Sequence, residues 1–199
     1  MARPATHDTD AMLDAARTVL LRVGVEGATV QAISHECGAP VGSLYNRFAS
    51  RQDLLARLWL RAAERSHAAC MPSLLQADAR KAAVELALRL VQFAREQPAD
   101  ARLLASFRRE DLLSPQLASS LAERLEQLNV PVQRALKQLA KRLYGDTRAE
   151  SLRQVSLAVV DLPLAAVQRY ALAGRPVPRD LDPHVERGVR AILTKRAPR

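Results

Sequence analysis

The sequence predicts an all-α protein, and three of its features support that prediction. Ala, Leu and Arg dominate the 199 residues while β-branched residues are sparse, a composition that favours helices. Apolar residues recur at three- and four-residue spacings, which is the spacing of one face of a helix. Glycines and prolines separate these periodic segments, as expected at helix ends. A chain of this length holds one or two small domains with a real core.

The composition is that of a soluble globular protein, with 48% hydrophobic and 26% charged residues. No uninterrupted apolar run approaches the ~18 residues of a membrane span, and the N-terminus lacks the apolar core of a signal peptide. We therefore expect a cytoplasmic protein without membrane contact. Cys37 and Cys70 fit a reducing compartment in which neither cysteine needs a partner.

The net charge of +9 is unevenly distributed along the chain. Residues 1–57 carry six basic and six acidic side chains and are neutral, whereas residues 58–110, 111–150 and 151–199 carry +3, +1 and +5. Because the excess lies outside the N-terminal segment, overall basicity is weak evidence that this segment binds nucleic acid.

Two helices are expected before the first glycine-rich turn. The first begins near Asp8 or Asp10, either of which is a possible cap, and ends at Gly24. The second begins after the capping residue Thr29 and ends at Gly38, where a left-handed residue is favoured. The inward-facing residues of these helices are Met12, Leu13, Ala16, Val19, Leu20, Val23, Val30, Ile33 and Cys37.

Further helices fill the rest of the chain. Pro40 fits the first turn of a third helix over residues 40–48, and Val41, Leu44 and Phe48 form its inward face. Ser50 caps a fourth helix that runs to about Met71, with Asp53 at capping-box spacing. Longer helices are predicted over 79–97, 99–110, 115–143 with a kink at Pro131, 149–173 with a kink at Pro163, and 182–195.

The short second and third helices, joined by a glycine-containing turn, are typical of a helix-turn-helix. In that motif the exposed side of the later helix lies in the major groove of DNA. Gly42 favours this interpretation, because glycine within a helix costs about 1 kcal/mol relative to alanine unless the backbone must be approached closely. Asn46 can pair with adenine, and Ser43 and Tyr45 can donate to phosphates. Arg51 adds a cation beside the N–H groups that begin the next helix.

The segment from Gly27 to Leu55 resembles the DNA-binding signature of TetR-family transcriptional regulators. Members typically show a Thr, a helix containing Ile-Ala, a Gly turn, then Gly-(Ser/Thr)-aromatic-Tyr-x-x-Phe and Lys-x-x-Leu-Leu. This chain matches that pattern at Thr29, Ile33, Gly38, Gly42, Ser43, Tyr45, Phe48, Leu54 and Leu55.

The chain departs from the signature at four positions. Pro40 replaces a common capping Ser, Leu44 replaces an aromatic residue, and Arg51 replaces a Lys. Val41 stands where a polar base-reading residue is frequent, which limits it to touching a thymine methyl group. Together, the outward positions and the resemblance indicate DNA contacts from Thr29, Gln31, Pro40, Val41, Gly42, Ser43, Tyr45, Asn46, Arg47 and Arg51.

The resemblance implies a DNA-binding domain over residues 1–54 and a helical effector-binding and dimerisation domain over residues 55–199. In the family the last two long helices pair across a two-fold axis. Both predicted helices are more apolar here than the outer helices of a monomer should be. The predicted dimer-interface residues are Leu152, Val155, Val159, Leu162, Val167, Val185, Val189, Ile192 and Leu193.

Five residues are candidates for the effector pocket. The aromatic residues Trp59, Phe93, Phe107 and Tyr170 either line a pocket or belong to the core, which is the commoner place for aromatic residues at helical spacing. Asp161 is the only acid in the apolar run SLAVVDLPLAAV. It is either a pocket carboxylate for a polar or cationic ligand, a cap for the helix restarted at Pro163, or an interface hydrogen-bonding group.

The function implied by the resemblance is that of a ligand-responsive transcriptional regulator, most often a repressor. It would bind a pseudo-palindromic double-stranded DNA operator on the nucleoid as a homodimer, with an unidentified small-molecule effector. The alternative is a dimeric DNA-binding regulator without an effector, either constitutive or controlled by a partner protein. An enzyme is not expected, because the sequence shows no catalytic order and no phosphate loop. His67 and Cys70 lack a third ligand nearby, so no metal or cofactor is expected.

Overall fold

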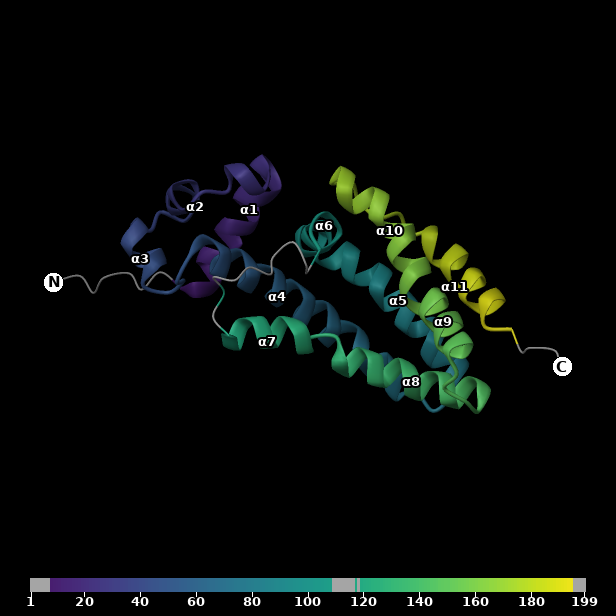
Figure 1. Cartoon of the computed structure of the whole chain (residues 1–199). Coiled ribbons are helices and arrows are strands. Elements are labelled where there is room, and N and C mark those ends of the chain that lie inside the picture. The colour runs from purple at the N-terminus through teal and green to yellow at the C-terminus, as the bar shows by residue number, and fades with distance from the viewer. Residues whose placement is uncertain (1–7, 109–116, 118, 195–199) are drawn as a thin grey trace. The chain divides into compact units, whose positions relative to one another are not determined.

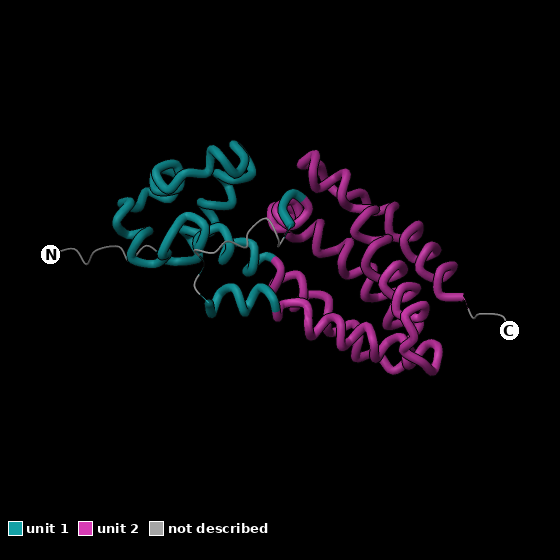
Figure 2. The backbone as a smooth tube through the Cα atoms, in the orientation of Figure 1, with its two compact units in different colours: residues 1–62, 106–126 teal, residues 63–105, 127–199 magenta. Residues whose placement is uncertain are grey.

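The computed structural model describes residues 8–108, 117 and 119–194 (Figure 1). These residues form helices joined by turns and no strands, so the predicted all-α fold is confirmed. The chain divides into two compact units (Figure 2). Unit 1 comprises residues 1–62 and 106–126, and unit 2 comprises residues 63–105 and 127–199.

Unit 1 contains the short helices expected near the N-terminus. They are α1 (Thr9–Gly27), α2 (Val30–Cys37), α3 (Val41–Tyr45), the first part of α4 (Arg51–Cys70) and nearly all of α7 (Ser119–Gln127). Helix α2 contacts both α1 and α3. The large side chains that these helices bury most completely are Met12, Val19, Ile33, Leu44, Phe48, Leu54, Leu58 and Leu125.

The ends of α1 and α2 follow the local signals in the sequence. The backbone leaves helical geometry at Gly24, whose φ is 74°, although helical hydrogen bonding resumes for one turn afterwards. The Thr29 hydroxyl caps α2 by accepting from the Ala32 amide at 3.1 Å, as predicted. Helix α2 ends at Gly38, whose φ of 64° is in the left-handed region where glycine avoids the penalty of a Cβ atom.

Two side chains before and within the first turn of α4 stabilise its N-terminus. The Asp53 amide donates to the Ser50 hydroxyl at 3.0 Å, and the Asp53 carboxylate accepts from the Ala49 amide at 3.1 Å. Arg57, one turn along, donates to both oxygens of the same buried carboxylate at 3.0 Å. These reciprocal bonds satisfy amides that a helix leaves without partners, as the predicted Ser50–Asp53 spacing indicated.

Unit 2 is a layered helical bundle around α5 (Ala79–Glu96). Helix α5 contacts η1 (Met71–Leu75), α8 (Val130–Tyr144), the π-helical turn η3 (Leu157–Asp161), α10 (Leu162–Ala173) and α11 (Leu181–Ile192). Helix α6 (Pro98–Ser106) and helix α9 (Ala149–Ser156) complete the unit. Its core includes Ala82, Ala83, Ala87, Val91, Leu139, Val155, Val159, Val185 and Val189.

Three predicted helices differ from those observed. The kink expected at Pro131 is a break, because α7 ends at Gln127 and α8 begins at Val130. The kink expected at Pro163 is a π-helical turn, in which the Leu162 amide donates to the Leu157 carbonyl. This wider turn accommodates a proline that lacks a donor and crowds the preceding carbonyl. The helix predicted over 99–110 ends at Ser106, and residues 109–116 lie outside the described residues.

The segment Ala149–Ala173 is long and apolar enough, by length and composition alone, to cross a membrane. Its most apolar 18-residue window has a mean hydropathy of 1.3 and still contains Asp161 and Arg169. A core helix of a soluble protein passes the same test, and the buried valines of this segment belong to the core of unit 2. One such segment does not indicate a membrane protein.

Leu44 and Tyr45 are neighbours on α3 that are 1% and 54% exposed. We expect Leu44→Ala to lower the free energy of unfolding by about 2–5 kcal/mol, because it leaves a cavity in the core. Tyr45→Ala should lower it by less than about 0.5 kcal/mol. Urea denaturation of both variants measures the difference, and equal losses would show that α3 is not seated through Leu44.

Candidate nucleic-acid interface

The buried side chains of α3 and of the turn that follows it determine which residues face outward. Leu44 and Phe48 are 1% and 2% exposed, and Ile33 of the bracing helix α2 is fully buried. Backbone bonds of helical type continue beyond α3, from the Asn46 amide to Gly42 and from the Phe48 amide to Leu44. This phase leaves four residues exposed, Pro40, Gly42, Tyr45 and Asn46, and three half-buried, Val41, Ser43 and Arg47.

The turn between α2 and α3 is held by a side chain as well as by its glycine. The Ser34 hydroxyl donates to the Ala39 carbonyl at 2.6 Å, and the Ala39 amide donates back to the Ser34 carbonyl at 3.2 Å. Pro40 is the N-cap residue of α3, with φ −55° and ψ 143°, and α3 has no side-chain cap. The Ser43 amide donates to the Pro40 carbonyl at 2.8 Å, which closes the first turn of α3 at this proline.

Gly42 has no structural need inside this chain to be glycine. Its φ is not in the left-handed region, and a Cβ atom built on it would meet nothing within 4 Å. It therefore bears the helix cost of glycine without relieving strain or a clash within the chain. A bare backbone at this exposed position leaves room for close approach by another molecule.

The outward face of α3 presents hydrogen-bonding groups and no carboxylate. Tyr45 and Asn46 are exposed, and the Arg47 guanidinium reaches back to the Ser43 carbonyl in a long contact of 3.4 Å. The carboxylates of Glu36 and Asp53 are each ion-paired with an arginine. A polyanion approaching α3 would therefore meet donors and no unpaired acid on the helix itself.

Arg51 is used inside unit 1, a role that sequence reasoning missed. Its Nε donates to the Ala28 carbonyl at 2.7 Å and its Nη2 donates to the Val25 carbonyl. The guanidinium thus ties the start of α4 to the turn between α1 and α2, where Thr29 also lies. The sequence suggested a cation beside helical N–H groups, but it did not reveal carbonyls brought close from more than twenty residues away.

The two predicted contacts on α2 lie at its N-terminus. Thr29 is exposed, its hydroxyl is occupied by the cap, and its amide donates to the Gly27 carbonyl at 2.8 Å. Gln31 is exposed in the first turn of α2. Both residues are accessible at the positive end of a helix dipole, a favourable place for an anion.

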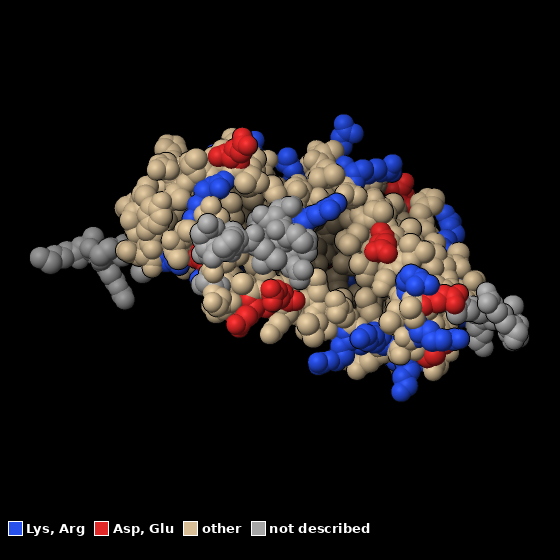
Figure 3. All heavy atoms as spheres, viewed as in Figure 1, with Lys and Arg blue, Asp and Glu red and all other residues tan. Residues whose placement is uncertain are grey.

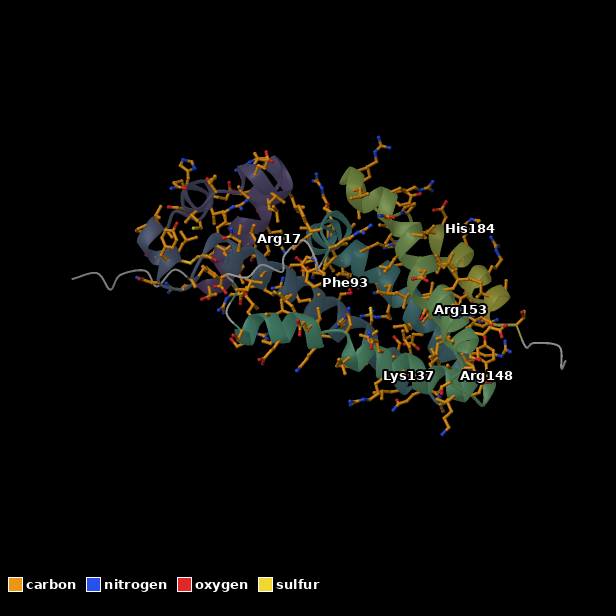
Figure 4. All side chains as sticks on the ribbon, viewed as in Figure 1. Arg17, Phe93, Lys137, Arg148, Arg153 and His184 are labelled. Carbon is orange, nitrogen blue, oxygen red and sulfur yellow. The ribbon has the colours of Figure 1, made fainter. Side chains whose placement is uncertain are left out.

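The five pocket candidates fall in different units. Trp59 and Phe107 lie in unit 1, where the indole Nε1 donates to the Phe107 carbonyl at 3.1 Å. Phe93 is buried on α5 in unit 2 and is labelled in Figure 4. Tyr170 of α10 is half-buried, and the Arg169 guanidinium lies 4.7 Å from its ring centroid.

Asp161 is exposed at the end of the π-helical turn and makes no side-chain cap to α10. It lines a surface hollow formed mainly by α9 and the π-helical turn. The other residues of the hollow are Glu150, Leu152, Arg153, Gln154, Ser156, Leu157 and Thr194.

The nine predicted interface residues divide into buried and half-buried groups. Val155, Val159, Val167, Val185, Val189 and Leu193 are 0–5% exposed within unit 2. These side chains pack against the core of unit 2 within a single chain. The half-buried residues are Leu152, Leu162 and Ile192.

A different set of apolar residues is exposed on the same segment. Leu157, Leu164 and Leu172 are 45–50% exposed, whereas Val159 and Val167 of the same segment are buried. Their spacings of seven and eight residues could have identified them, but periodicity alone does not tell which of two apolar faces meets the core.

The cysteine and histidine residues form no metal site in the part of the chain that the structure describes. No three His, Cys, Asp or Glu residues there gather as a metal site. Burial lowers the pKa of His67 and raises the pKa of Cys70 to about 11, so the Cys70 thiol stays protonated and unreactive at neutral pH.

Comparison with known proteins relates both the site and the fold to a family. Residues 12–58 match the family model described as bacterial regulatory proteins, tetR family. This match contains α2, α3 and the start of α4. No curated protein matches the sequence.

Solved structures with the same fold span nearly the whole chain. A TetR family transcription regulator from Marinobacter aquaeolei VT8 has 17% identity and a TM-score of 0.71, covering 93% of each chain. The TetR family regulator PfmR from Thermus thermophilus has 17% identity and a TM-score of 0.71, covering 96% of this chain and 98% of its own. FadR from Bacillus subtilis, solved with stearoyl-CoA, has 14% identity and a TM-score of 0.68, covering 94% and 98%.

Gly42→Ala provides a test of whether the glycine serves the fold. Because open space surrounds the added methyl group, we expect the variant to gain about 0.5–1 kcal/mol in its free energy of unfolding. Gly38→Ala is the matched control and should lose about 1–2 kcal/mol, because its φ is positive. Destabilisation by Gly42→Ala in urea denaturation would mean that the glycine has an internal role.

Proposed function

We propose that the chain is a transcriptional regulator of the tetR family of bacterial regulatory proteins, whose family model matches residues 12–58, and that it represses transcription as a ligand-responsive homodimer. Members of this family are DNA-binding regulators and not enzymes. In this proposal the protein is cytoplasmic, and residues 1–54 bind a pseudo-palindromic operator of the nucleoid DNA. Residues 55–199 dimerise and bind the effector.

The observation that carries the DNA-binding proposal is the exposed, unconstrained Gly42. A Cβ atom at Gly42 would meet nothing within 4 Å, and the opposite face of the helix is buried through Leu44 and Phe48. A major groove admits such a helix only where side chains do not hold it away. Gly42 therefore allows the backbone of α3 to lie against the duplex.

Each exposed residue of α3 has a chemistry suited to the duplex. Tyr45 donates its hydroxyl to a phosphate, as does Ser43, while Asn46 pairs bidentately with adenine. Val41 and Pro40 offer only apolar contact, suited to a thymine methyl group. Few direct base contacts then come from the first turn, and phosphate contacts position the helix.

The remaining candidates serve the N-terminal ends of the neighbouring helices. Thr29 and Gln31 approach a phosphate at the start of α2, and Arg47 remains near enough to add charge. Arg51 acts mainly by position, since two carbonyl contacts hold its guanidinium on the α1–α2 turn. It holds the start of α4 close to the start of α2, so that both helix ends can face the same DNA strand.

The homodimer in this proposal uses the exposed apolar side chains of η3 and α10. Leu157, Leu164 and Leu172 are each about half exposed on a segment whose opposite face is already buried. A two-fold interface requires one patch that is complementary to itself, which a straight apolar stripe provides. The half-buried residues Leu162 and Ile192 add to its edge.

The effector in this proposal acts through α4, which belongs to both units. In unit 1, Arg61 of α4 donates to Asp10 at 2.7 Å and to Asp14 at 2.6 Å, so a shift of α4 also pulls on α1. Because the α3 helices of both protomers must fit one operator, a small change in the distance between them weakens specific binding. Since one protein of this fold binds stearoyl-CoA, a long-chain acyl-CoA is the first effector to test.

Footprinting on DNA flanking the gene that encodes this chain tests the assignment of α3. We expect protection of two half-sites about one helical turn apart or further. Gly42→Leu should abolish protection while leaving the fold intact, and Tyr45→Phe should weaken it about tenfold through loss of one hydrogen bond to a charged phosphate. Protection retained by Gly42→Leu would remove α3 from the interface. Stearoyl-CoA and other candidate ligands, added in the same assay, test the response to an effector.

Sedimentation of Leu164→Glu tests the proposed dimer face. Leu164 is 47% exposed, so the charge should spare the protomer but make a two-fold apolar interface unfavourable, leaving a monomer at micromolar concentration. Leu75→Glu is the control, since Leu75 is 87% exposed on η1, outside the stripe. A dimeric Leu164→Glu would place the interface elsewhere.

A further inference from the structure

The charge of this chain is separated from its proposed DNA-reading helix. Residues 1–57 are neutral, so the whole excess of nine positive charges lies further along the sequence. Helix α8 shows the separation most clearly. From Asn129 to Gly145 the sequence contains Arg134, Lys137, Lys141 and Arg142 but no Asp or Glu.

Three of these cations form a stripe of free charge along α8, which we call the α8 stripe: Arg134, Lys137 and Lys141. All three are exposed, at positions i, i+3 and i+7 of one helix face, and none of their side chains makes an ion pair or hydrogen bond with the described residues. Figure 4 labels Lys137 on α8, and Figure 3 shows Lys and Arg side chains gathered over this part of unit 2.

Eight arginines of the described residues pair with carboxylates, whereas the cations of the α8 stripe do not. Arginines that pair with carboxylates in the described residues are Arg17, Arg22, Arg57, Arg61, Arg65, Arg95, Arg148 and Arg190. On α8, Lys137 and Lys141 instead repel each other, an arrangement that costs an isolated helix about 0.2–0.5 kcal/mol. An anionic partner would relieve that repulsion.

Arg142, the fourth cation of α8, holds this helix near two further cations, Arg80 and Lys81. Arg142 donates to the carbonyls of Leu74 and Ala77 at 3.0 Å and to that of Gln76, so α8 lies against the turn that leads into α5. Arg80 and Lys81 are exposed in the first turn of α5. The nearby acid Asp78 is the N-cap of α5 and accepts from their backbone amides, and Glu85 accepts from Gln76.

The geometry of the α8 stripe suits the backbone of a DNA duplex. At 1.5 Å per residue, its ends lie about 10 Å apart along the helix axis. A duplex carries one phosphate charge per ~1.7 Å of its axis, so a stripe of that length meets several phosphates. The one aromatic residue of α8, Tyr144, is half-buried and offers no stacking surface for single strands.

We propose that the α8 stripe is a second, sequence-independent binding surface for the phosphate backbone of double-stranded DNA. The choice of DNA rests on the proposed function, because binding through α3 raises the local concentration of duplex around the rest of the chain. The surface itself is distinct from α3 and lies wholly in unit 2. It supplies the salt-sensitive, non-specific affinity that the neutral N-terminal segment lacks.

The experiment measures binding of the full chain to a random-sequence duplex as a function of salt, in a Gly42→Leu background that disables α3. The double variant Lys137→Gln/Lys141→Gln should lower the slope of log K against log salt by about 2, since each lost phosphate contact removes ~0.9. The control variant Arg175→Gln/Arg179→Gln also removes two exposed cations from unit 2 and should leave the slope unchanged.

Two results would overturn the proposal. An unchanged slope in the α8 variant, or equal losses in both variants, would show that the stripe makes no specific contribution. Loss of binding to poly-L-glutamate with the DNA slope retained would assign the stripe to an acidic protein instead. Because operator footprinting depends on α3 and uses specific DNA, failure here is distinguishable from failure of the proposed function.

Discussion

Burial of two side chains, Leu44 and Phe48, holds the short helix α3 in unit 1. A helix of five residues has no stability of its own, so burial of Leu44 and of Phe48 just beyond it holds α3 in place. Burial on one side leaves only one side for function, and it places Gly42, Tyr45 and Asn46 there together. The same packing that forms the core of the motif therefore selects the residues that we propose to meet DNA.

Arginine contacts connect this small motif to α4. Arg51 joins α4 to the α1–α2 turn, and Arg61 joins α4 to the beginning of α1. Both contacts lie in unit 1, whereas α4 continues into unit 2. In the proposed mechanism α4 is the shared element, because an effector changes DNA affinity only through an element whose position both sites bias.

Local signals made much of unit 1 predictable. Thr29, Gly38 and the Ser50–Asp53 pair specify helix ends through their own side chains or backbone, so the sequence alone indicates them. The role of Arg51 was not predictable, because its carbonyl partners are distant in sequence. Six of the nine predicted interface residues are buried within unit 2, and the sequence could not show this because a helix with two apolar faces gives one periodicity whichever face is buried. The π-helical turn before Pro163 likewise depends on packing as well as on the proline.

Hydrogen exchange with and without DNA examines α3 as the DNA-reading helix without any substitution, because it reports the backbone amides themselves. We expect slower exchange in a peptide covering residues 40–47 when an operator duplex is added, and a smaller effect from a scrambled duplex at the same ionic strength. Unchanged exchange in that peptide, with protection confined to other helices, would contradict the assignment of α3 as the DNA-reading helix.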